Sequence, residues 1–267
     1  MLGDSITESR SARNGEKVSD YTKTTINSLS MGRNEWLIIN EGKGNETIQR
    51  ALKRIDSILA RERPEFLSIA YGLIDASKKD PVGFQGSVIQ LINTVHIFDP
   101  NVVIILVATV PIDESIHFYG KNRYFKKYGG ANRYINNHIN GILRNIAFQN
   151  NLPFINMFRF LEEREEWRDS ISMDGIHPNA AGNRLIGEYI GRVLYTYYSA
   201  RMRNDENAVQ AENDAHHLMK AVVQRFFFSR GNEVLECIEM EERAWQLCPY
   251  LPDMTRPILL SILSSYK

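Results

Sequence analysis

The chain has 267 residues, of which 43% are hydrophobic, so it is long enough for one large domain with a small appendage. Lysine plus arginine equals aspartate plus glutamate at 32 each, and this balance predicts no general attraction to nucleic acid or to a charged membrane surface. The longest apolar run, residues 102–110, is too short to span a bilayer. We therefore expect neither a nucleic-acid partner nor a membrane-spanning segment.

The expected compartment is the cytoplasm. Cys237 and Cys248 both lie in the last quarter of the chain, and two thiols there fit a reducing compartment better than a disulfide scaffold, although one bridge stays open. No basic start followed by an apolar segment indicates a secretion signal. Only Met1 and Leu2 precede Gly3, whereas strands usually run about five or six residues. Either this first strand is short or upstream residues are missing, in which case the lack of a signal proves little.

Short apolar runs alternate along the chain with stripes of apolar residues at helical spacing. In chain order they predict a short strand at 1–2, a helix at 18–29, a buried strand at 36–40, a helix at 48–59, a strand at 66–70, a helix at 88–98, a strand at 102–109, a helix at 134–146, a strand at 152–157 and a closing helix at 181–197. This alternation predicts an α/β fold of three layers, α/β/α, with a parallel, flavodoxin-like sheet of about five strands. A ligand site is expected beyond the carboxyl ends of the strands.

Two segments stand apart from this alternation. The long loop at residues 110–130 mixes aromatic and basic side chains, and it fits a substrate lid and a solvent-exposed flap equally well. After residue 198 the composition changes, because residues 201–214 are polar and residues 218–247 are helical in composition. We predict a main domain at 1–198 and a helical extension at 199–267 that packs on the main domain or binds a partner, including a second copy of the chain.

A serine near the start and an aspartate–histidine pair near the end of the main domain are the candidate chemical groups. Ser5 follows Gly3 and Asp4 where the first strand ends, while Asp174 and His177 stand three residues apart. Nucleophilic acyl chemistry needs an alcohol, a base within hydrogen-bond reach and a third group that orients the base. Either stretch alone is typical of a plain turn, but the predicted sheet would bring the two together.

Four stretches resemble, in order and spacing, the motif blocks of the SGNH (GDSL-type) esterase and acylhydrolase family. They are Gly-Asp-Ser-Ile-Thr at residues 3–7, Asn-Glu-Gly-Lys-Gly-Asn-Glu-Thr at 40–47, Tyr-Gly-Leu-Ile-Asp-Ala at 71–76 and Asp-Gly-Ile-His-Pro-Asn at 174–179. The resemblance covers about residues 1–198. It implies that Ser5 is the nucleophile, that His177 accepts its proton and that Asp174 orients and stabilises the imidazole ring.

The resemblance also implies an oxyanion hole with three donors. One is the backbone N–H of Ser5, one is a backbone N–H of the second block at Asn45 or the adjacent Gly44, and one is an asparagine side chain of the third block. Ile74 stands at that asparagine position and donates no hydrogen bond. Losing one such donor typically lowers turnover by roughly 10²–10³-fold, which weakens an enzyme without abolishing its activity.

Three further residues, Asp4, Gly72 and Asp75, are predicted to lie at the substrate site, and Asp4 is also expected to brace the serine turn. No spacing of ligands indicates a metal, and no cofactor is expected. The first hypothesis is a serine ester hydrolase that acts on a small-molecule ester, for example an acetylated carbohydrate. The alternatives are a degenerate domain that binds a glycan or a protein partner, and an acyltransferase that uses the same three residues.

Overall fold

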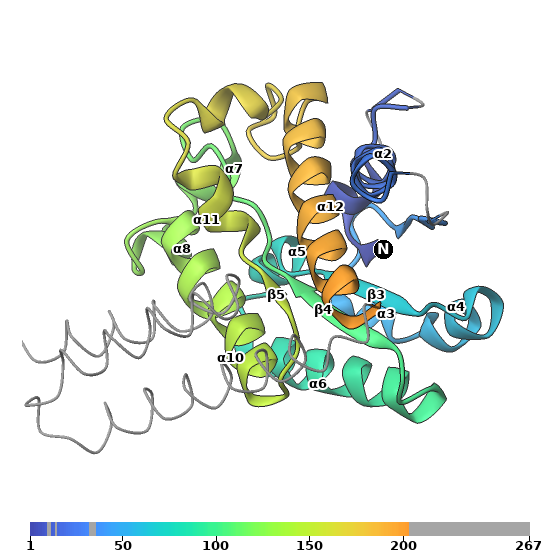
Figure 1. Cartoon of the computed structure of the whole chain (residues 1–267). Coiled ribbons are helices and arrows are strands. Elements are labelled where there is room, and N and C mark those ends of the chain that lie inside the picture. The colour runs from blue at the N-terminus through green and yellow to red at the C-terminus, as the bar shows by residue number, and fades with distance from the viewer. Residues whose placement is uncertain (10–11, 14, 32–35, 203–267) are drawn as a thin grey trace, which may run out of the picture.

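The computed structural model describes residues 1–9, 12–13, 15–31 and 36–202. They form a sheet of five parallel strands in the order β2-β1-β3-β4-β5, which is the flavodoxin-like order (Figure 1). The strands are β1 (Leu2–Gly3), β2 (Glu41–Gly42), β3 (Phe66–Ala70), β4 (Val103–Val107) and β5 (Phe154–Ile155). The predicted α/β fold, the parallel sheet and the number of strands are confirmed.

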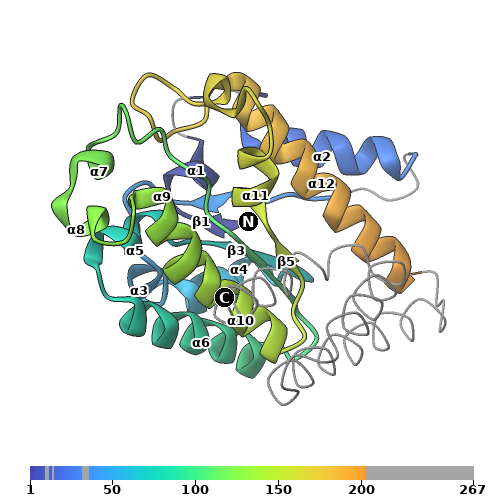
Figure 2. The ribbon, with the colours of Figure 1, turned by 90° about the vertical axis from the view of Figure 1, so that its left-hand side faces the viewer.

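Helices cover both faces of the sheet, as Figures 1 and 2 show. One face carries α2 (Val18–Leu29) and α12 (Ala180–Met202), which pack on each other. The other face carries α3 (Ile48–Ala51), α4 (Ile55–Glu62), α6 (Pro81–Phe98) and a continuous helical run made of α9 (Ala131–Tyr134), the π-helix η1 (Ile135–Asn140) and α10 (Gly141–Gln149). The remaining elements are α1 (Ser5–Glu8), α5 (Leu73–Lys78), α7 (Phe118–Lys121), α8 (Arg123–Lys126), α11 (Met157–Glu162) and the 3₁₀-helix η2 (Trp167–Ser170).

The core lies between the sheet and its two helical layers. Strand β4 is apolar on both sides, as a strand covered by helices on each face should be, and Ile104, Ile105 and Leu106 are all buried. Helix α12 runs past the predicted domain boundary at residue 198 as far as Met202. The rest of the predicted extension, with Cys237 and Cys248, lies outside the described residues.

The prediction of a buried strand at residues 36–40 is wrong. The paired strand is Glu41–Gly42, and Leu37 is exposed. The physical reason is the shortness of β1: Leu2 pairs with Glu41, and the Met1 ammonium donates to the Ile39 carbonyl, where the ladder stops. A groove of about 570 Å³ lies there, between residues 36–39 and the amino end of β3.

The single helix predicted at residues 48–59 is two helices, α3 and α4. The chain turns between them, and Arg54 adopts a non-helical conformation at the start of α4. Its guanidinium binds the Glu46 carboxylate and the Glu41 carbonyl, at 2.7 and 2.6 Å. These contacts with the preceding loop favour the turn over a continuous helix. None of the helices in the described ranges is long and apolar enough to cross a bilayer.

Candidate active site

The serine is placed by a short helix that begins directly after β1. Asp4 is the N-cap of α1, and its Oδ1 accepts a hydrogen bond from the Ile6 N–H at 3.0 Å. A capping carboxylate satisfies a backbone donor that the first turn leaves free. Ser5 is the first residue of α1 and is largely buried. The predicted bracing role of Asp4 is thus visible in the hydrogen bond that it makes.

Asp174 and His177 lie on a loop whose two ends are held together by backbone contacts. Ile171 and Pro178 form an isolated antiparallel bridge, and the Ser172 N–H donates to the His177 carbonyl at 2.7 Å. Within the loop, one oxygen of Asp174 accepts from the backbone N–H of His177 at 3.0 Å. The loop therefore holds the carboxylate and the imidazole in one fixed arrangement.

Ser5, His177 and Asp174 form a connected hydrogen-bonded chain. His177 Nε2 lies 2.9 Å from Ser5 Oγ, and His177 Nδ1 lies 2.6 Å from Asp174 Oδ2. With Nδ1 donating to the carboxylate, Nε2 is left free to accept the hydroxyl proton. This is the geometry that an activated serine nucleophile requires.

The charge of Asp174 supports the same orientation. Partial desolvation disfavours the carboxylate, but the hydrogen bonds from the side chain and backbone of His177 outweigh it and hold the pKa of Asp174 below its usual value. An ionised Asp174 is placed to stabilise a positive charge on the His177 ring. The His177 and Asp174 side chains both reach solvent, so the pair is accessible from outside.

The second block passes directly beside the serine. A Cβ placed on Gly44 would lie 4.0 Å from Ser5 Cβ and 2.6 Å from Glu8 Oε2, so a side chain at this position would have to displace the end of the Glu8 side chain. The next residue, Asn45, has a left-handed backbone conformation with φ 58°, which asparagine tolerates better than most residues. Gly44 thus lies beside the nucleophile, and the part of the Gly44 or Asn45 N–H in an oxyanion hole stays a prediction.

The third block contributes no amide at the predicted position. Ile74 is the second residue of α5 and is half-buried, while Gly72 is the N-cap of this helix with φ 142°. Asp75 is buried, and its Oδ1 accepts from the Ile48 N–H at 3.1 Å. Asp75 therefore connects α5 to the start of α3. Substrate contacts of Asp75 and Gly72 stay predictions.

An ion pair that the sequence did not reveal fixes the second block. Glu46, next to Asn45, is buried and accepts from Tyr71 Oη at 2.6 Å and from Arg54 Nη2 at 2.7 Å. Tyr71 belongs to the third block and Arg54 to the turn before α4. Buried charges of this kind need a partner, so the three side chains lock two motif loops together. The one sequence signal that could have indicated this ion pair is the glutamate inside the second motif block.

The loop at residues 110–130 also reaches the site. The Asp113 N–H donates to the Gly175 carbonyl at 2.8 Å, and the Tyr119 hydroxyl contacts the Leu73 carbonyl at 3.4 Å. His117 is buried in the same segment, and desolvation lowers the pKa of its imidazole, with the charge of His177 acting in the same direction. His117 was not predicted, because its role depends on a contact between distant loops.

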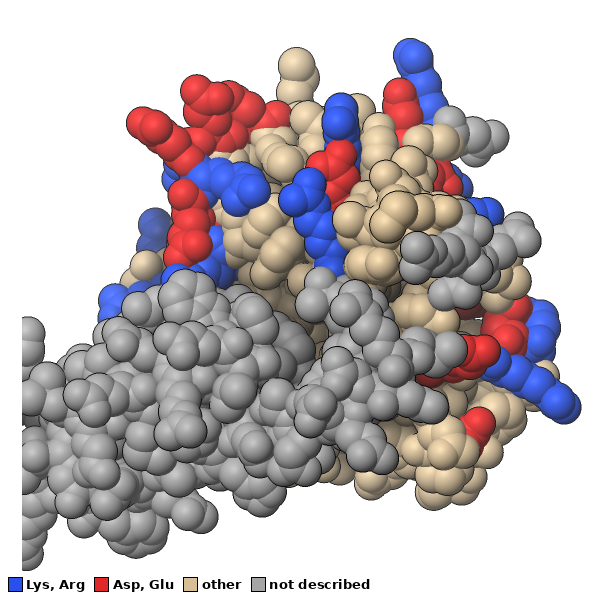
Figure 3. Space-filling model, viewed as in Figure 1, with Lys and Arg blue, Asp and Glu red and all other residues tan. Residues whose placement is uncertain are grey.

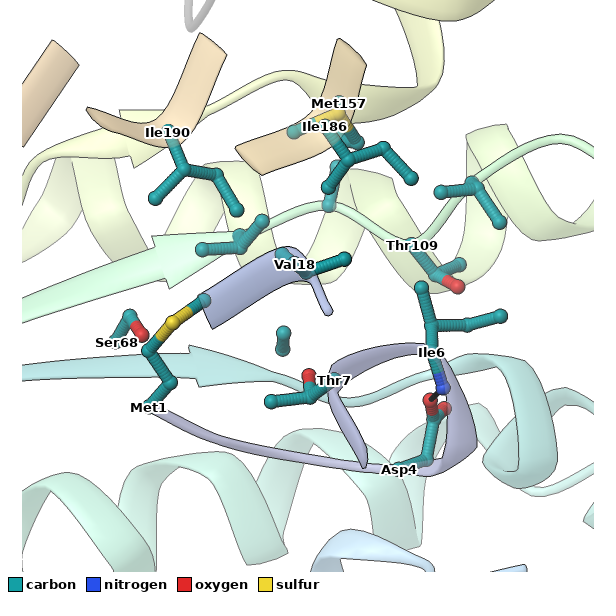
Figure 4. A pocket seen from close by; sticks show the side chains of 14 residues that line it. Met1, Asp4, Ile6, Thr7, Val18, Ser68, Thr109, Met157, Ile186 and Ile190 are labelled. Atoms are coloured by element: carbon teal, nitrogen blue, oxygen red, sulfur yellow. Dashed lines mark hydrogen bonds between the residues drawn. The ribbon is translucent and has the colours of Figure 1, made fainter. Parts of the chain in front are cut away.

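A small cavity lies behind α1, lined on one side by Asp4, Ile6 and Thr7 and on the other by Ile186 and Ile190 (Figure 4). Its volume of about 30 Å³ has room for about one water molecule, so it is not a substrate site. Within the described part of the chain, no group of three histidine, cysteine or acidic side chains is arranged to hold a metal ion.

Solved structures of esterases and acylhydrolases share the fold. A lipase/acylhydrolase from Enterococcus faecalis superposes with a TM-score of 0.58 at 22% identity over 73% of this chain and 94% of its own. An acetyl xylan esterase, AlAXEase, gives 0.56 at 21% identity over 72% and 97% of the two chains. The esterase EstA from Pseudoalteromonas sp. gives 0.57 at 17% over 74% and 96%.

The sequence itself decides the family. No match was found among curated protein sequences. Residues 1–185, which include all four motif blocks and the hydrogen-bonded serine, histidine and aspartate, match the profile of the GDSL-like lipase/acylhydrolase family. The chain therefore belongs to the GDSL-like lipase/acylhydrolase family.

Proposed function

We propose that the protein is a serine ester hydrolase that works through an acyl-enzyme. The observation that carries this proposal is the hydrogen-bonded chain from Ser5 Oγ to His177 Nε2 and from His177 Nδ1 to Asp174 Oδ2. Family membership supports the same reaction class. Acidic and basic side chains are interspersed over the described surface seen in Figure 3, which fits a small-molecule substrate better than a polyanion.

The proposed reaction has two halves. His177 Nε2 takes the hydroxyl proton as Ser5 Oγ attacks the ester carbonyl carbon, and the same proton passes to the departing alcohol when the carbon–oxygen bond breaks. Water then attacks the acyl-serine, with His177 again as the base, and the acid leaves with Ser5 restored. Backbone N–H groups of Ser5 and of Gly44 or Asn45 are the proposed donors to the negative oxygen.

A carboxylic ester with a small acyl group, such as an acetylated carbohydrate, is the proposed starting substrate class. Support comes from the shared fold with the acetyl xylan esterase. Transfer of the acyl group to a sugar hydroxyl would use the same three residues. Binding of a partner through residues 199–267 and a cytoplasmic location stay predictions.

A second candidate function is a weakened domain that binds a glycan or protein partner without hydrolysing it. Ile74 favours this alternative, because its side chain supplies no donor to a developing negative charge. The connected serine, histidine and aspartate favour the enzyme.

Hydrolysis of p-nitrophenyl acetate separates the two candidates. We expect Ser5→Ala and His177→Ala each to lower kcat by at least about 10³-fold, because the nucleophile or its base is lost. His96→Ala is the matched control, since this half-buried histidine lies on α6 and should leave the rate unchanged. Equal rates for the wild type and the Ser5 variant would exclude the hydrolase.

A further inference from the structure

Helix α6 contains no aspartate, glutamate, lysine or arginine. It runs for 18 residues, Pro81–Phe98, in the helical layer on the far side of the sheet from α2 and α12 (Figure 2). The four charged residue types make up 24% of the chain, so their absence from a long surface helix is unusual. A surface helix normally presents charged or polar side chains to water, whereas a helix that is apolar all round is buried. The outer face of α6 is therefore a candidate interface.

Two sets of residues divide α6 into an inner and an outer face. The inner set is buried in the core and consists of Phe84, Val88, Leu91, Ile92 and Val95. The outer set is exposed, recurs at steps of three or four residues and consists of Val82, Gly86, Ile89, Asn93 and Ile97. Steps of this size place the outer set along one side of the helix. We call these five outer residues the α6 stripe.

The α6 stripe exposes apolar side chains on both sides of a glycine. Val82 is 78% exposed, Ile89 is 41% exposed and Ile97 is 86% exposed. A Cβ built on Gly86 would meet no heavy atom of the described chain within 4 Å. A glycine inside a helix is destabilising relative to alanine, and packing within the described chain does not require one here. Close approach of a second backbone to the outside of α6 does require one.

A second copy of α6 is complementary to the α6 stripe. In a two-fold interface, a residue of one copy contacts a different residue of the other copy, and the same contact is then made a second time. A two-fold axis that crosses α6 midway between Gly86 and Ile89 places each Gly86 opposite Ile89 of the second copy. The isoleucine side chain then fills the open space over the glycine. Because α6 carries no charge, this pairing brings no like charges of the two helices together.

We propose that the α6 stripe is the interface of a symmetric homodimer, in which the α6 helices of two copies pack antiparallel with Gly86 of each copy against Ile89 of the other. This surface is separate from the extension at residues 199–267. It is also separate from the proposed reaction, because none of the stripe residues belongs to one of the four motif blocks.

Sedimentation equilibrium of the full chain over a range of concentrations tests the interface, and the wild type should be a dimer. Gly86→Gln adds a side chain where the single copy has open space, so circular dichroism should show an intact fold while the Kd of the dimer rises by about tenfold or more. Ile89→Lys should raise this Kd by a similar factor, because dimerisation would bury the new charges. Leu29→Lys is the matched control: Leu29 is 38% exposed on α2, on the other face of the sheet, and the Kd should change by less than about twofold.

Disulfide formation tests the pairing of residues directly. In chains whose Cys237 and Cys248 are replaced by serine, a mixture of Gly86→Cys and Ile89→Cys chains should give a disulfide-linked dimer. A mixture of Leu29→Cys and Ile89→Cys chains should give none.

Three outcomes would overturn the proposal: a wild type that stays monomeric at every concentration, a dimer whose Kd neither stripe variant changes, or a dimer without the mixed disulfide between positions 86 and 89. A monomer would mean that α6 has no self-association and that any cover for its outer face comes from elsewhere. Both experiments measure association and not hydrolysis, so an inactive protein would refute the proposed function and leave this test intact.

Discussion

Ile74 stands at the position where the resemblance implies an asparagine, and it defines a test of the oxyanion hole. The side chain is half-buried at the start of α5, so an asparagine there fits without burying an unpaired amide. If the missing donor limits the reaction, Ile74→Asn should raise kcat for p-nitrophenyl acetate by about tenfold or more.

Ile74→Leu is the control for this prediction, because it changes the shape of the side chain without adding a donor. The leucine variant should stay within a few-fold of the wild type. Unchanged turnover in Ile74→Asn would mean that another group, such as Asn45, already stabilises the negative oxygen.

At the scale of the element, the π-helix η1 shapes the chain that leaves β4. Asn140, the last residue of η1, is fully buried, and its side chain accepts from the Thr109 N–H at 2.9 Å and donates to the Thr109 carbonyl at 3.3 Å. Thr109 follows the end of β4, where the chain enters the loop at residues 110–130. The side-chain amide of Asn140 thus satisfies both the N–H and the carbonyl of Thr109, which lies beyond the end of β4.

We expect Asn140→Ala to destabilise the fold by about 2–4 kcal/mol, because both backbone groups of Thr109 lose their partner inside the core. Urea denaturation followed by circular dichroism measures the change. Asn137→Ala, at an exposed position of the same π-helix, controls for the better helix propensity of alanine and should cost little or nothing. Equal effects of the two variants would contradict the assignment.

The elements show which parts of the fold a linear pattern can predict. Helix α2 and strand β3 begin and end at the predicted residues, since each carries its own apolar period and its own boundary signals. Residues 36–40 have the same apolar character as β3 but no strand beside them to pair with. The break between α3 and α4 depends on the ion pair between Arg54 and Glu46, and the spacing of apolar residues along the helices does not reveal that ion pair.

At the scale of the whole molecule, stability should depend on pH through carboxyl groups buried behind the serine. Burial raises the pKa of Asp4 to about 7 and the pKa of Asp75 to about 6, and the charge of Asp75 also raises the pKa of Asp4. The folded protein therefore keeps these protons at pH values where the unfolded chain, with a pKa of 3.8, has lost them. Stability is greatest below about pH 4 for these groups and falls as the pH rises to about 7.

Asp75→Asn isolates the contribution of one of these groups. Its amide oxygen can still accept from the Ile48 N–H, while the cost of burying a charge disappears. A pKa raised from 3.8 to about 6 corresponds to roughly 3 kcal/mol, so the variant should be more stable than the wild type by about that amount at pH 8 and no different at pH 4. Urea midpoints at the two pH values measure this, and a constant difference between them would refute it.

The sequence predicted the three side chains that form the hydrogen-bonded chain at the candidate site, but not the contacts that support them. Ser5, Asp174 and His177 belong to motif blocks with a fixed spacing, and a parallel sheet brings such blocks to one edge. His117 and the Arg54–Tyr71 pair around Glu46 act through contacts between loops far apart in sequence. These contacts can be identified only in the folded structure.

The hydrogen bond between Ser5 and His177 joins residues 172 positions apart. During synthesis the Ser5 hydroxyl is made long before His177, and the strands β2 to β5 are made in between. A nascent chain that ends before residue 177 therefore lacks the base of the proposed reaction. A polypeptide cut within a surface loop should regain its reactivity only when both pieces reassociate.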